Sequence, residues 1–202
     1  MKRKIVIIGG VAGGATAAAR LRRLNEEDEI VIFEKGEYIS FANCGLPYHI
    51  GGVIQERDNL VLETVGGMAK KFNIGIKNFS EVVKINRGKK TITVKHVITG
   101  ATTEESYDKL IISTGARPIK PAITGIEDAQ NVFTLRNIPD MDKIKAYITE
   151  HQVKRATVIG GGFIGLEMME NLWELGIHVS LVEMSDQVMA PIDFEMAQSV
   201  HA

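Results

Sequence analysis

Short, continuous runs of apolar residues recur along the chain and are rich in β-branched side chains. They cover residues 4–8, 29–33, 109–112, 156–159 and 178–182. Runs that are apolar at every position are typical of parallel strands buried on both faces of a sheet. Helix-like segments follow two of these runs, at 15–24 and 166–175. Strands that alternate with helices predict an α/β protein built from Rossmann-like units.

Between residues 73 and 107 the pattern changes to strand-like runs separated by polar turns. These runs lie at 74–76, 82–85, 91–97 and 104–107. Their spacing predicts an antiparallel meander inserted into the first α/β unit. Pro118 and Pro121 then mark a linker, and residues 139–151 are expected to form a helix with proline in its first turn.

Composition narrows the class of protein. The chain has 202 residues, of which 45% are hydrophobic, so it can bury a core. Its 24 basic and 25 acidic residues are interspersed and give a net charge of -1, which argues against nucleic acid or an anionic membrane as a partner. The single cysteine allows no internal disulfide, and a cytoplasmic location is the default expectation.

The first glycine-rich turn follows the strand at residues 4–8. In the Gly-x-Gly-x-x-Gly register its three glycine positions hold Gly9, Val11 and Gly14, so the match is imperfect. The next strand ends at Glu34, twenty residues after Gly14, where a carboxylate can accept hydrogen bonds from ribose hydroxyls. An ordinary strand-turn-helix with glycines for packing is the alternative, but the spacing favours a dinucleotide site.

The second glycine-rich turn is a full match. The nucleotide is expected to contact Gly160, Gly162, Phe163, Ile164, Gly165 and Glu183. Glu183 lies eighteen residues after Gly165 and can accept from the 2′-hydroxyl of NADH, whereas it would repel the 2′-phosphate of NADPH. NADH is therefore expected rather than NADPH.

Two such units about 150 residues apart suggest two different dinucleotides in one enzyme. FAD in the first and a nicotinamide nucleotide in the second is the plausible pair, because a flavin can pass electrons from NADH to a thiol. We therefore expect an FAD-binding domain over residues 1–118, a linker and helix over 119–150, and the start of an NAD(H)-binding domain over 151–202. The second domain is expected to be incomplete.

Cys44 lies in the run Ser-Phe-Ala-Asn-Cys-Gly-Leu-Pro-Tyr, which covers residues 40–48. A solitary cysteine is most often a small buried hydrophobe. Turn-forming residues on both sides and the position ten residues after Glu34 favour a redox role instead. His49 could tune a thiolate at Cys44, but a partly exposed helix residue is the simpler expectation. The histidines show no metal-ligand spacing, so no metal site is expected.

Four segments carry a resemblance to a known family. They are residues 7–14, 40–48, 113–118 and 160–165 together with Glu183. The chain resembles the flavin-dependent pyridine nucleotide-disulfide oxidoreductases along its whole length. Within them it is most similar to the single-cysteine branch of coenzyme A-disulfide reductases and NADH-dependent coenzyme A persulfide or polysulfide reductases. Valine at the second glycine position is usual in that branch.

The resemblance implies that NADH reduces the flavin and that electrons then pass to sulfur at Cys44. Cys44 would alternate between a thiolate and a mixed disulfide or persulfide with coenzyme A. With no second cysteine in the chain, the resolving sulfur must come from the substrate. The start of a helix is a favourable place for a nucleophilic thiolate.

Particular residues acquire roles through the resemblance alone. The implied flavin-binding residues are Gly9, Ala12, Gly13, Glu34, Lys35, Val82, Thr114, Gly115 and Arg117. The implied coenzyme A contacts are Thr16, Arg20, Arg23, Ser40 and Asn43. Arginine suits this task because its forked donors match phosphate oxygens. A solvated helix face is the alternative explanation for these arginines.

Members of the family continue beyond the last strand found here and form homodimers, so this sequence is expected to be a fragment or a truncated product. Two other functions remain open. Cys44 could cycle through a sulfenic acid in an NADH oxidase or peroxidase, with oxygen or peroxide as the acceptor. Alternatively, the chain could be a nucleotide-binding module without turnover.

Overall fold

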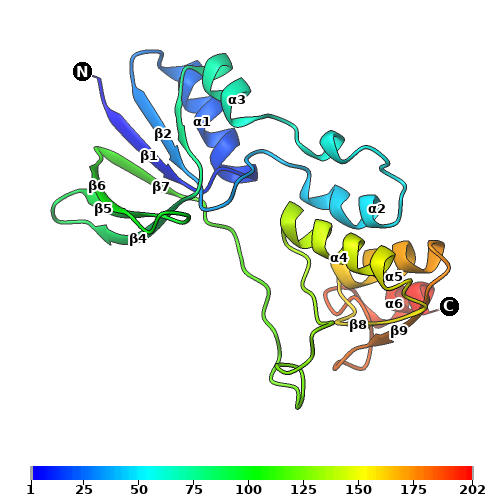
Figure 1. The fold of residues 1–202 in the computed structure, drawn as a ribbon. Helices are drawn as coiled ribbons and strands as arrows, with labels where there is room; N and C mark the ends of the chain where they lie inside the picture. Colours follow the sequence, from blue (N-terminus) through cyan, green and yellow to red (C-terminus); the bar gives the residue numbers. More distant parts are fainter. Residues whose placement is uncertain (1, 202) are drawn as a thin grey trace. The chain divides into compact units, whose positions relative to one another are not determined.

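The structure, a computed structural model, describes residues 2–201, and these form two compact units (Figure 1). The first unit comprises the residues up to Ala42 together with Val61–Arg117. The second comprises Asn43–Leu60 and the residues from Pro118 onward. The break at Arg117 and Pro118 falls where the proline-rich segment begins. The assignment of one bound nucleotide to each of the predicted domains stays a prediction.

The first unit is built on a parallel sheet of four strands. The order across the sheet is β3 (Gly75–Lys77), β2 (Glu29–Phe33), β1 (Lys4–Ile8) and β7 (Lys109–Ile112). All three pairings are parallel, and Lys4 lies opposite Glu29. The β-branched runs at 4–8, 29–33 and 109–112 are therefore strands β1, β2 and β7, and the α/β class is confirmed. The prediction of a buried strand at 109–112 was wrong, because β7 lies at the edge of the sheet and Ile112 is 63% exposed.

Both faces of this sheet are covered, which explains why β1 and β2 are apolar at every position after their first residue. Helices α1 (Ala12–Leu24) and α3 (Val65–Phe72) lie on one face, and the antiparallel strands lie on the other (Figure 1). Alternate residues of β1 follow this division. Ile5 and Ile7 pack in the cluster beneath the helices, whereas Val6 packs with Ile92 and Val94.

The predicted meander is present as β4 (Ser80–Asn86), β5 (Thr91–His96) and β6 (Thr102–Ser106). Glu105 of β6 pairs with Lys4 of β1 at 2.8 Å and also with Lys77 of β3. These ion pairs connect the polar edge of the meander to the strands of the parallel sheet. The Rossmann-like unit with an inserted antiparallel meander is confirmed.

One predicted strand has a different role from the one expected. Residues 74–76 were assigned to the meander, but β3 pairs in parallel with β2 at the edge of the main sheet. Helix α3, which precedes β3, was not predicted, because two glycines near its start lower its helix propensity. Its ends explain why it forms. Thr64 accepts a hydrogen bond from the Gly67 amide at 3.0 Å, and Asn73 ends the helix with a φ of 48°.

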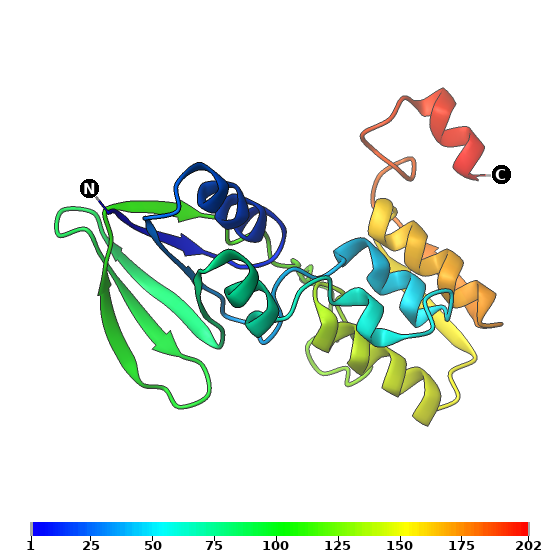
Figure 2. The same cartoon turned by 90° about the horizontal axis from the view of Figure 1, so that it is seen from above.

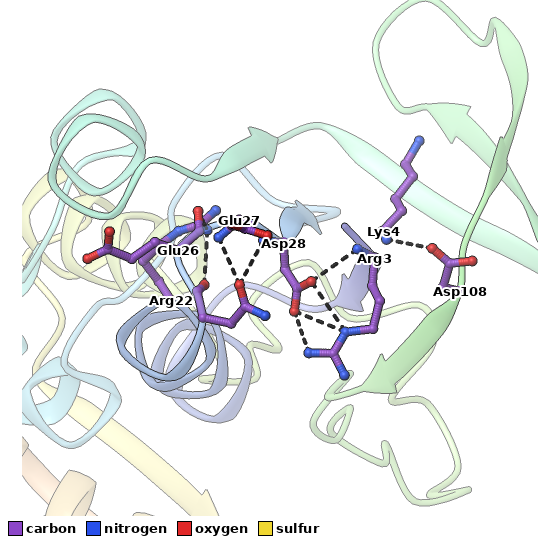
Figure 3. Close-up of polar contacts among 8 residues, drawn as sticks. Arg3, Lys4, Arg22, Glu26, Glu27, Asp28 and Asp108 are labelled. Atoms are coloured by element: carbon purple, nitrogen blue, oxygen red, sulfur yellow. Dashed lines mark hydrogen bonds and ion pairs between the residues drawn. The ribbon is translucent and has the colours of Figure 1, made fainter. Parts of the chain in front are cut away.

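Where β1, β2 and β7 begin, polar groups connect the starts of these strands to one another (Figure 3). The Asp28 carboxylate accepts from the Arg3 amide at 3.0 Å and from the Arg3 guanidinium at 2.6 Å. Asp108 accepts from the Lys4 amide at 2.7 Å. The side chain of Asp28 is only 2% exposed, and the hydrogen bonds from Arg3 lower the pKa of its carboxyl.

We expect Asp28→Asn to lower the urea midpoint of unfolding at pH 7. The pKa of Asp28 is lower in the folded chain than in the unfolded chain, so the carboxylate stabilises the fold above its unfolded pKa of about 4. This contribution is lost as the pH falls through the lower, folded pKa. Urea titrations between pH 7 and pH 2 should show the variant and the wild type converging in acid. Glu26→Gln, at an exposed neighbouring position, should change neither the midpoint nor its pH dependence.

The second unit contains a pair of parallel strands, β8 (Arg155–Ile159) and β9 (His178–Val182). Helix α5 (Phe163–Glu174) connects them, α4 (Ile138–Glu150) precedes them, and α6 (Phe194–His201) follows. The predicted helix at 139–151 is therefore α4. Asn137 caps it by accepting from the Asp140 amide at 2.9 Å.

The residues around Cys44 pack on the helices of this second unit. They form the turn η1 (Asn43–Gly45), helix α2 (Leu46–Ile50) and the turn η2 (Arg57–Leu60). Helix α2 lies beside both α4 and α5 (Figure 2). Leu46 and Ile50 are buried there. The segment that carries Cys44 is thus held by helices that come almost a hundred residues later in the chain.

Candidate functional site: two nucleotide loops and one cysteine

The first glycine-rich turn connects β1 to α1 at the carboxyl end of the sheet. Gly9 has a φ of +97°, and a Cβ atom there would lie well under 3.0 Å from the Ser113 carbonyl oxygen. A Cβ atom at Gly14 would collide in the same way with the Gly9 carbonyl. These two positions need glycine for the fold itself. Val11, at the second glycine position, has a φ of -86°, which any residue can adopt.

Glu34 closes this turn from the end of β2. One carboxylate oxygen accepts from the Gly10 amide at 2.7 Å, and the other accepts from the Gly36 amide at 2.7 Å. The acidic residue predicted from spacing is therefore fixed against the loop. Its remaining lone pairs can accept from ribose hydroxyls.

Ser40 is also tied to this loop. Its amide donates to the Gly10 carbonyl at 3.1 Å, and its own carbonyl accepts from the amides of Leu62 and Glu63. Ser40 has a φ of 45°, the left-handed region that non-glycine residues rarely occupy. Backbone strain of this kind is often found at functional sites. The structure places Ser40 beside the loop, and its contact with coenzyme A stays a prediction.

The segment after β7 borders the same loop. Ser113 was not singled out from the sequence, yet its Oγ lies 2.5 Å from the position that a Cβ atom on Gly13 would take. The Thr114 amide nitrogen is 3.3 Å from the corresponding position on Gly9. Thr114, Gly115 and Arg117 follow and are exposed. Residues from the far end of the unit's sequence thus meet Gly9 and Gly13.

Lys35, at the end of β2, lies beside the start of β4, the strand that carries Val82. The Ser80 amide donates to the Glu34 carbonyl at 2.8 Å, and Lys35 pairs with Glu81 at 2.8 Å. The register of β4 shifts between Val82 and Lys84, so a β-bulge follows Val82. A bulge leaves backbone groups outside the regular ladder, which suits the backbone role that the resemblance implies for Val82.

The predicted coenzyme A contacts on α1 share one exposed face. Thr16, Arg20 and Arg23 are exposed and follow one another at helical spacing. Arg22 differs, because its guanidinium donates to the carbonyls of Phe72 at 2.9 Å and Asn73 at 2.7 Å. Arg22 therefore fastens α1 to the end of α3, and only its neighbours are available to an anion.

The second glycine-rich turn repeats the geometry of the first. Gly160 has a φ of +106°, and its amide donates to the Val182 carbonyl at 2.8 Å. The Gly9 amide donates to the carbonyl of Phe33 at the same distance. A Cβ atom on Gly165 would collide with the Gly160 carbonyl, as at the equivalent pair in the first unit. Gly162 is different, because a Cβ atom there meets nothing within 4 Å.

Glu183 closes the second turn as Glu34 closes the first. Its carboxylate accepts from the Gly161 amide at 2.6 Å and from the Ser185 amide at 2.8 Å. These hydrogen bonds, above all the one from Gly161, lower the pKa of Glu183 to about 2. Glu183 is therefore ionised at neutral pH, the state that accepts from a ribose hydroxyl and repels a phosphate.

The repeat extends to a residue that the sequence did not reveal. Met189 lies six positions after Glu183, as Ser40 lies six positions after Glu34. The Met189 amide donates to the Gly161 carbonyl at 2.8 Å, and its φ is 53°. Aligning the two acidic residues would have paired Met189 with Ser40. In both loops, the glycine that directly follows the first glycine of the motif is thus bound twice. Its amide donates to an acidic side chain, and its carbonyl accepts from the amide of a residue in the left-handed backbone conformation.

The starts of the two loop helices are open to a ligand. Among the described residues, no side chain caps the first turn of α1 or of α5. Phe163 and Ile164, in the first turn of α5, are 61% and 59% exposed. Free amides at a helix start attract phosphate, so both turns can hold a pyrophosphate.

Cys44 lies in η1 of the second unit and is exposed. The alternative of a small buried hydrophobe is therefore excluded for this thiol. Asn43, its neighbour, is exposed as well. The expectation for His49 was wrong, because its side chain is buried and the residue is only 4% exposed. Its ring contacts the Ile54 carbonyl and Lys145.

A hollow of about 340 Å³ lies near the start of β2, away from the glycine-rich turn. Its charged lining consists of Lys2, Arg22, Glu26, Glu27, Asp28 and Glu29. Acidic groups outnumber basic ones there, which is unfavourable for a pyrophosphate. Nucleotides in open α/β sheets bind at the carboxyl ends of the strands, so the glycine-rich turns remain the candidate sites.

Membrane-spanning helices and clusters of metal-binding side chains are both absent from the described residues 2–201. No helix there is both long and apolar enough to cross a membrane. Within this range, no group of three or more His, Cys, Asp or Glu side chains is arranged so that it could hold a metal ion.

Two repeated dinucleotide loops and one exposed cysteine define a nucleotide-dependent redox protein of the α/β class. The chain belongs to the pyridine nucleotide-disulphide oxidoreductase family, whose pattern matches residues 3–202. Membership implies a flavin and a nicotinamide nucleotide as cofactors. The family resemblance predicted from the motifs is confirmed.

Individual proteins within this family are similar to the chain over nearly all of its length. The chain is 43% identical to the coenzyme A disulfide reductase of Staphylococcus haemolyticus over 198 residues, which are 98% of this chain and 44% of that protein. It spans less than half the length of that curated relative. The structure of reduced Bacillus anthracis CoADR-RHD is 65% identical with a TM-score of 0.97, covering 100% of this chain and 36% of that one. An NAD-dependent persulfide reductase from A. fulgidus is 41% identical with a TM-score of 0.91, covering 98% and 36%.

Proposed function

We propose that this chain is the nucleotide-binding and thiol-bearing part of a reductase that uses NADH to reduce a disulfide or persulfide of coenzyme A. The observation that carries the proposal is the repeated loop, with an acidic residue bound to a glycine amide in each unit, in a chain whose single cysteine is exposed. The names of the two persulfide and disulfide reductases to which the chain is similar support this substrate class.

The first loop is proposed to hold FAD. Its first-turn amides on α1 would bind the pyrophosphate, Glu34 would accept from the ribose, and Val82 would offer backbone groups to the adenine. Lys35, Thr114, Gly115 and Arg117 complete the proposed set. A bound flavin supplies two-electron transfer between a nicotinamide and sulfur. Gly9, Ala12 and Gly13 shape the surface on which the pyrophosphate would lie.

The second loop is proposed to hold NADH. Ionised Glu183 would accept from the 2′-hydroxyl of the adenosine ribose and disfavour the 2′-phosphate of NADPH. The pKa of about 2 means that Glu183 stays ionised between pH 5 and pH 8. Any change of the discrimination in this range should come from the 2′-phosphate of NADPH, because the second pKa of a phosphate monoester is about 6. Gly162 allows the backbone to approach the pyrophosphate closely, since a side chain there would project into open space.

Cys44 is proposed to be the nucleophile. Its thiolate attacks one sulfur of coenzyme A disulfide, a new S–S bond forms between Cys44 and one coenzyme A, and the second coenzyme A leaves as a thiolate. With both nucleotides bound, two electrons from NADH would be supplied through the flavin to cleave this mixed disulfide, which would release the remaining coenzyme A as a thiolate and regenerate the Cys44 thiolate. Thr16, Arg20, Arg23, Ser40 and Asn43 are the proposed coenzyme A contacts, and the two arginines suit its phosphates.

An anaerobic titration tests this proposal on the 202-residue chain loaded with FAD. NADH should bleach the flavin band near 450 nm, and coenzyme A disulfide should then restore it. NADPH should bleach it far less. Flavin that binds but is not bleached by NADH would contradict the enzyme proposal and favour a nucleotide-binding module. Reoxidation by peroxide but not by coenzyme A disulfide would favour a peroxidase with a sulfenic acid at Cys44.

A further inference from the structure

The segment Asn43–Leu60 is attached to one face of α4 by two polar contacts. The Arg57 guanidinium donates to both carboxylate oxygens of Asp142, at 2.9 Å and 2.7 Å. The Lys145 ammonium donates to the His49 carbonyl at 3.0 Å and contacts the His49 ring at 3.2 Å. Asp142 and Lys145 are three residues apart, so they project from the same side of the helix.

The contacts of His49 define its protonation. Its Nδ1 lies 2.6 Å from the Ile54 carbonyl, which can only accept, so Nδ1 carries the hydrogen. Its Nε2 faces the Lys145 ammonium, which can only donate, so Nε2 must offer a lone pair. Both contacts are satisfied only by a neutral imidazole. A protonated ring would place two cationic donors against each other inside the unit.

Packing against α5 fixes the other side of this segment. Gly51, which follows α2, lies so close to Asn171 that an added Cβ atom would come within 2.8 Å of the Asn171 Cβ. Asn171 is buried and is held by its own hydrogen bond to the Glu167 carbonyl at 2.8 Å. The far end of α2 is therefore held on both sides. Cys44, in the turn directly before α2, is left exposed.

We propose that His49 and Lys145 are positioning residues for Cys44. They hold α2 on α4 through a neutral imidazole and an ammonium, and so fix where the preceding turn presents the thiol. Neither residue is proposed to touch the substrate. This inference rests on the proposed function in one respect, since Cys44 is taken as the reacting thiol.

The test compares Lys145→Met with two matched variants of the 202-residue chain. Lys143→Met removes the same charge from an exposed position of α4, and Lys145→Arg keeps a cationic donor. In Lys145→Met, hydrogen exchange at the Gly51 and Ile54 amides should rise about fivefold, the effect of one lost hydrogen bond on local opening. The rate of Cys44 alkylation by N-ethylmaleimide should move towards the rate of the urea-unfolded chain at the same pH.

Lys143→Met should match the wild type in both measurements, and Lys145→Arg should lie closer to the wild type than Lys145→Met does. Circular dichroism checks that each variant is folded. Unchanged exchange at Gly51 and Ile54 would overturn the proposal. Faster exchange in Lys145→Met with an unchanged rate of Cys44 alkylation would overturn it as well. So would a wild-type alkylation rate that already equals the rate of the unfolded chain, because the fold would then not position the thiol. Neither measurement uses flavin or NADH, so failure of the proposed function would appear separately, in the anaerobic titration.

Discussion

Replacing Cys44 with serine is expected to reduce the NADH-dependent reduction of coenzyme A disulfide by at least about 10³-fold. A serine hydroxyl is a poor nucleophile at neutral pH and cannot form the mixed disulfide. The reason lies in the composition of the chain, since no second thiol can replace the first. Mass spectrometry after incubation with coenzyme A disulfide should find one coenzyme A attached to the wild type and none attached to Cys44→Ser.

The remaining functions of the Cys44→Ser variant should be intact. Cys44 is exposed and lies in the second unit, whereas the proposed flavin loop belongs to the first. Flavin content and bleaching by NADH should therefore match the wild type. Val53→Ala is the matched control, because Val53 belongs to the same segment and is 68% exposed. Disulfide reduction that persists in Cys44→Ser would remove this thiol from the mechanism.

The parts of the fold that could be predicted are those with a local physical cause. Strands β1, β2, β7, β8 and β9 were found as short runs rich in β-branched residues. The covered faces that such runs predict are present at β1 and β2, whereas β7, β8 and β9 are partly exposed. The acidic residues after β2 and β9 were found from spacing alone, and both accept from a glycine amide of their loop. In each case the signal lay within about thirty residues of the chain.

The parts that could not be predicted depend on contacts between distant residues. Strand β3 is three residues long, and its parallel pairing is set by β2 rather than by its own pattern. His49 is buried because Lys145, 96 residues later, supplies its partner. Ser113 borders the glycine-rich turn only because β7 pairs with β1. No local window of the sequence contains both members of any of these pairs.

The repeat between the two units explains why an imperfect motif was still informative. The first and third glycines of each turn are required by backbone geometry, because Gly9 and Gly160 have φ values of +97° and +106° and because added Cβ atoms at Gly14 and Gly165 collide with carbonyls. The middle position has an ordinary φ in both turns, -86° at Val11 and -81° at Gly162. Valine at the middle position therefore leaves the fold intact, and we expect glycine there to serve the proposed ligand.

This difference predicts opposite results for two alanine substitutions in the second turn. Gly162→Ala should leave the free energy of unfolding unchanged or raise it by up to about 1 kcal/mol. The added methyl group meets nothing within 4 Å, and the φ of -81° suits alanine. The same methyl group should weaken NADH binding by at least about tenfold, since the second glycine lets the backbone approach the pyrophosphate. Gly165→Ala should lower the midpoint, because its methyl group collides with the Gly160 carbonyl.

Urea denaturation and calorimetric titration with NADH separate the two effects. If the loop binds pyrophosphate, Gly162→Ala should be folded but should bind NADH weakly. Gly165→Ala should lose NADH binding only in proportion to the loss of the folded turn between β8 and α5. Wild-type affinity in Gly162→Ala would show that the pyrophosphate does not lie on this turn. A lowered urea midpoint in Gly162→Ala would mean that the middle glycine is needed for the fold. This result would contradict the expectation from the open space around the position of its Cβ atom.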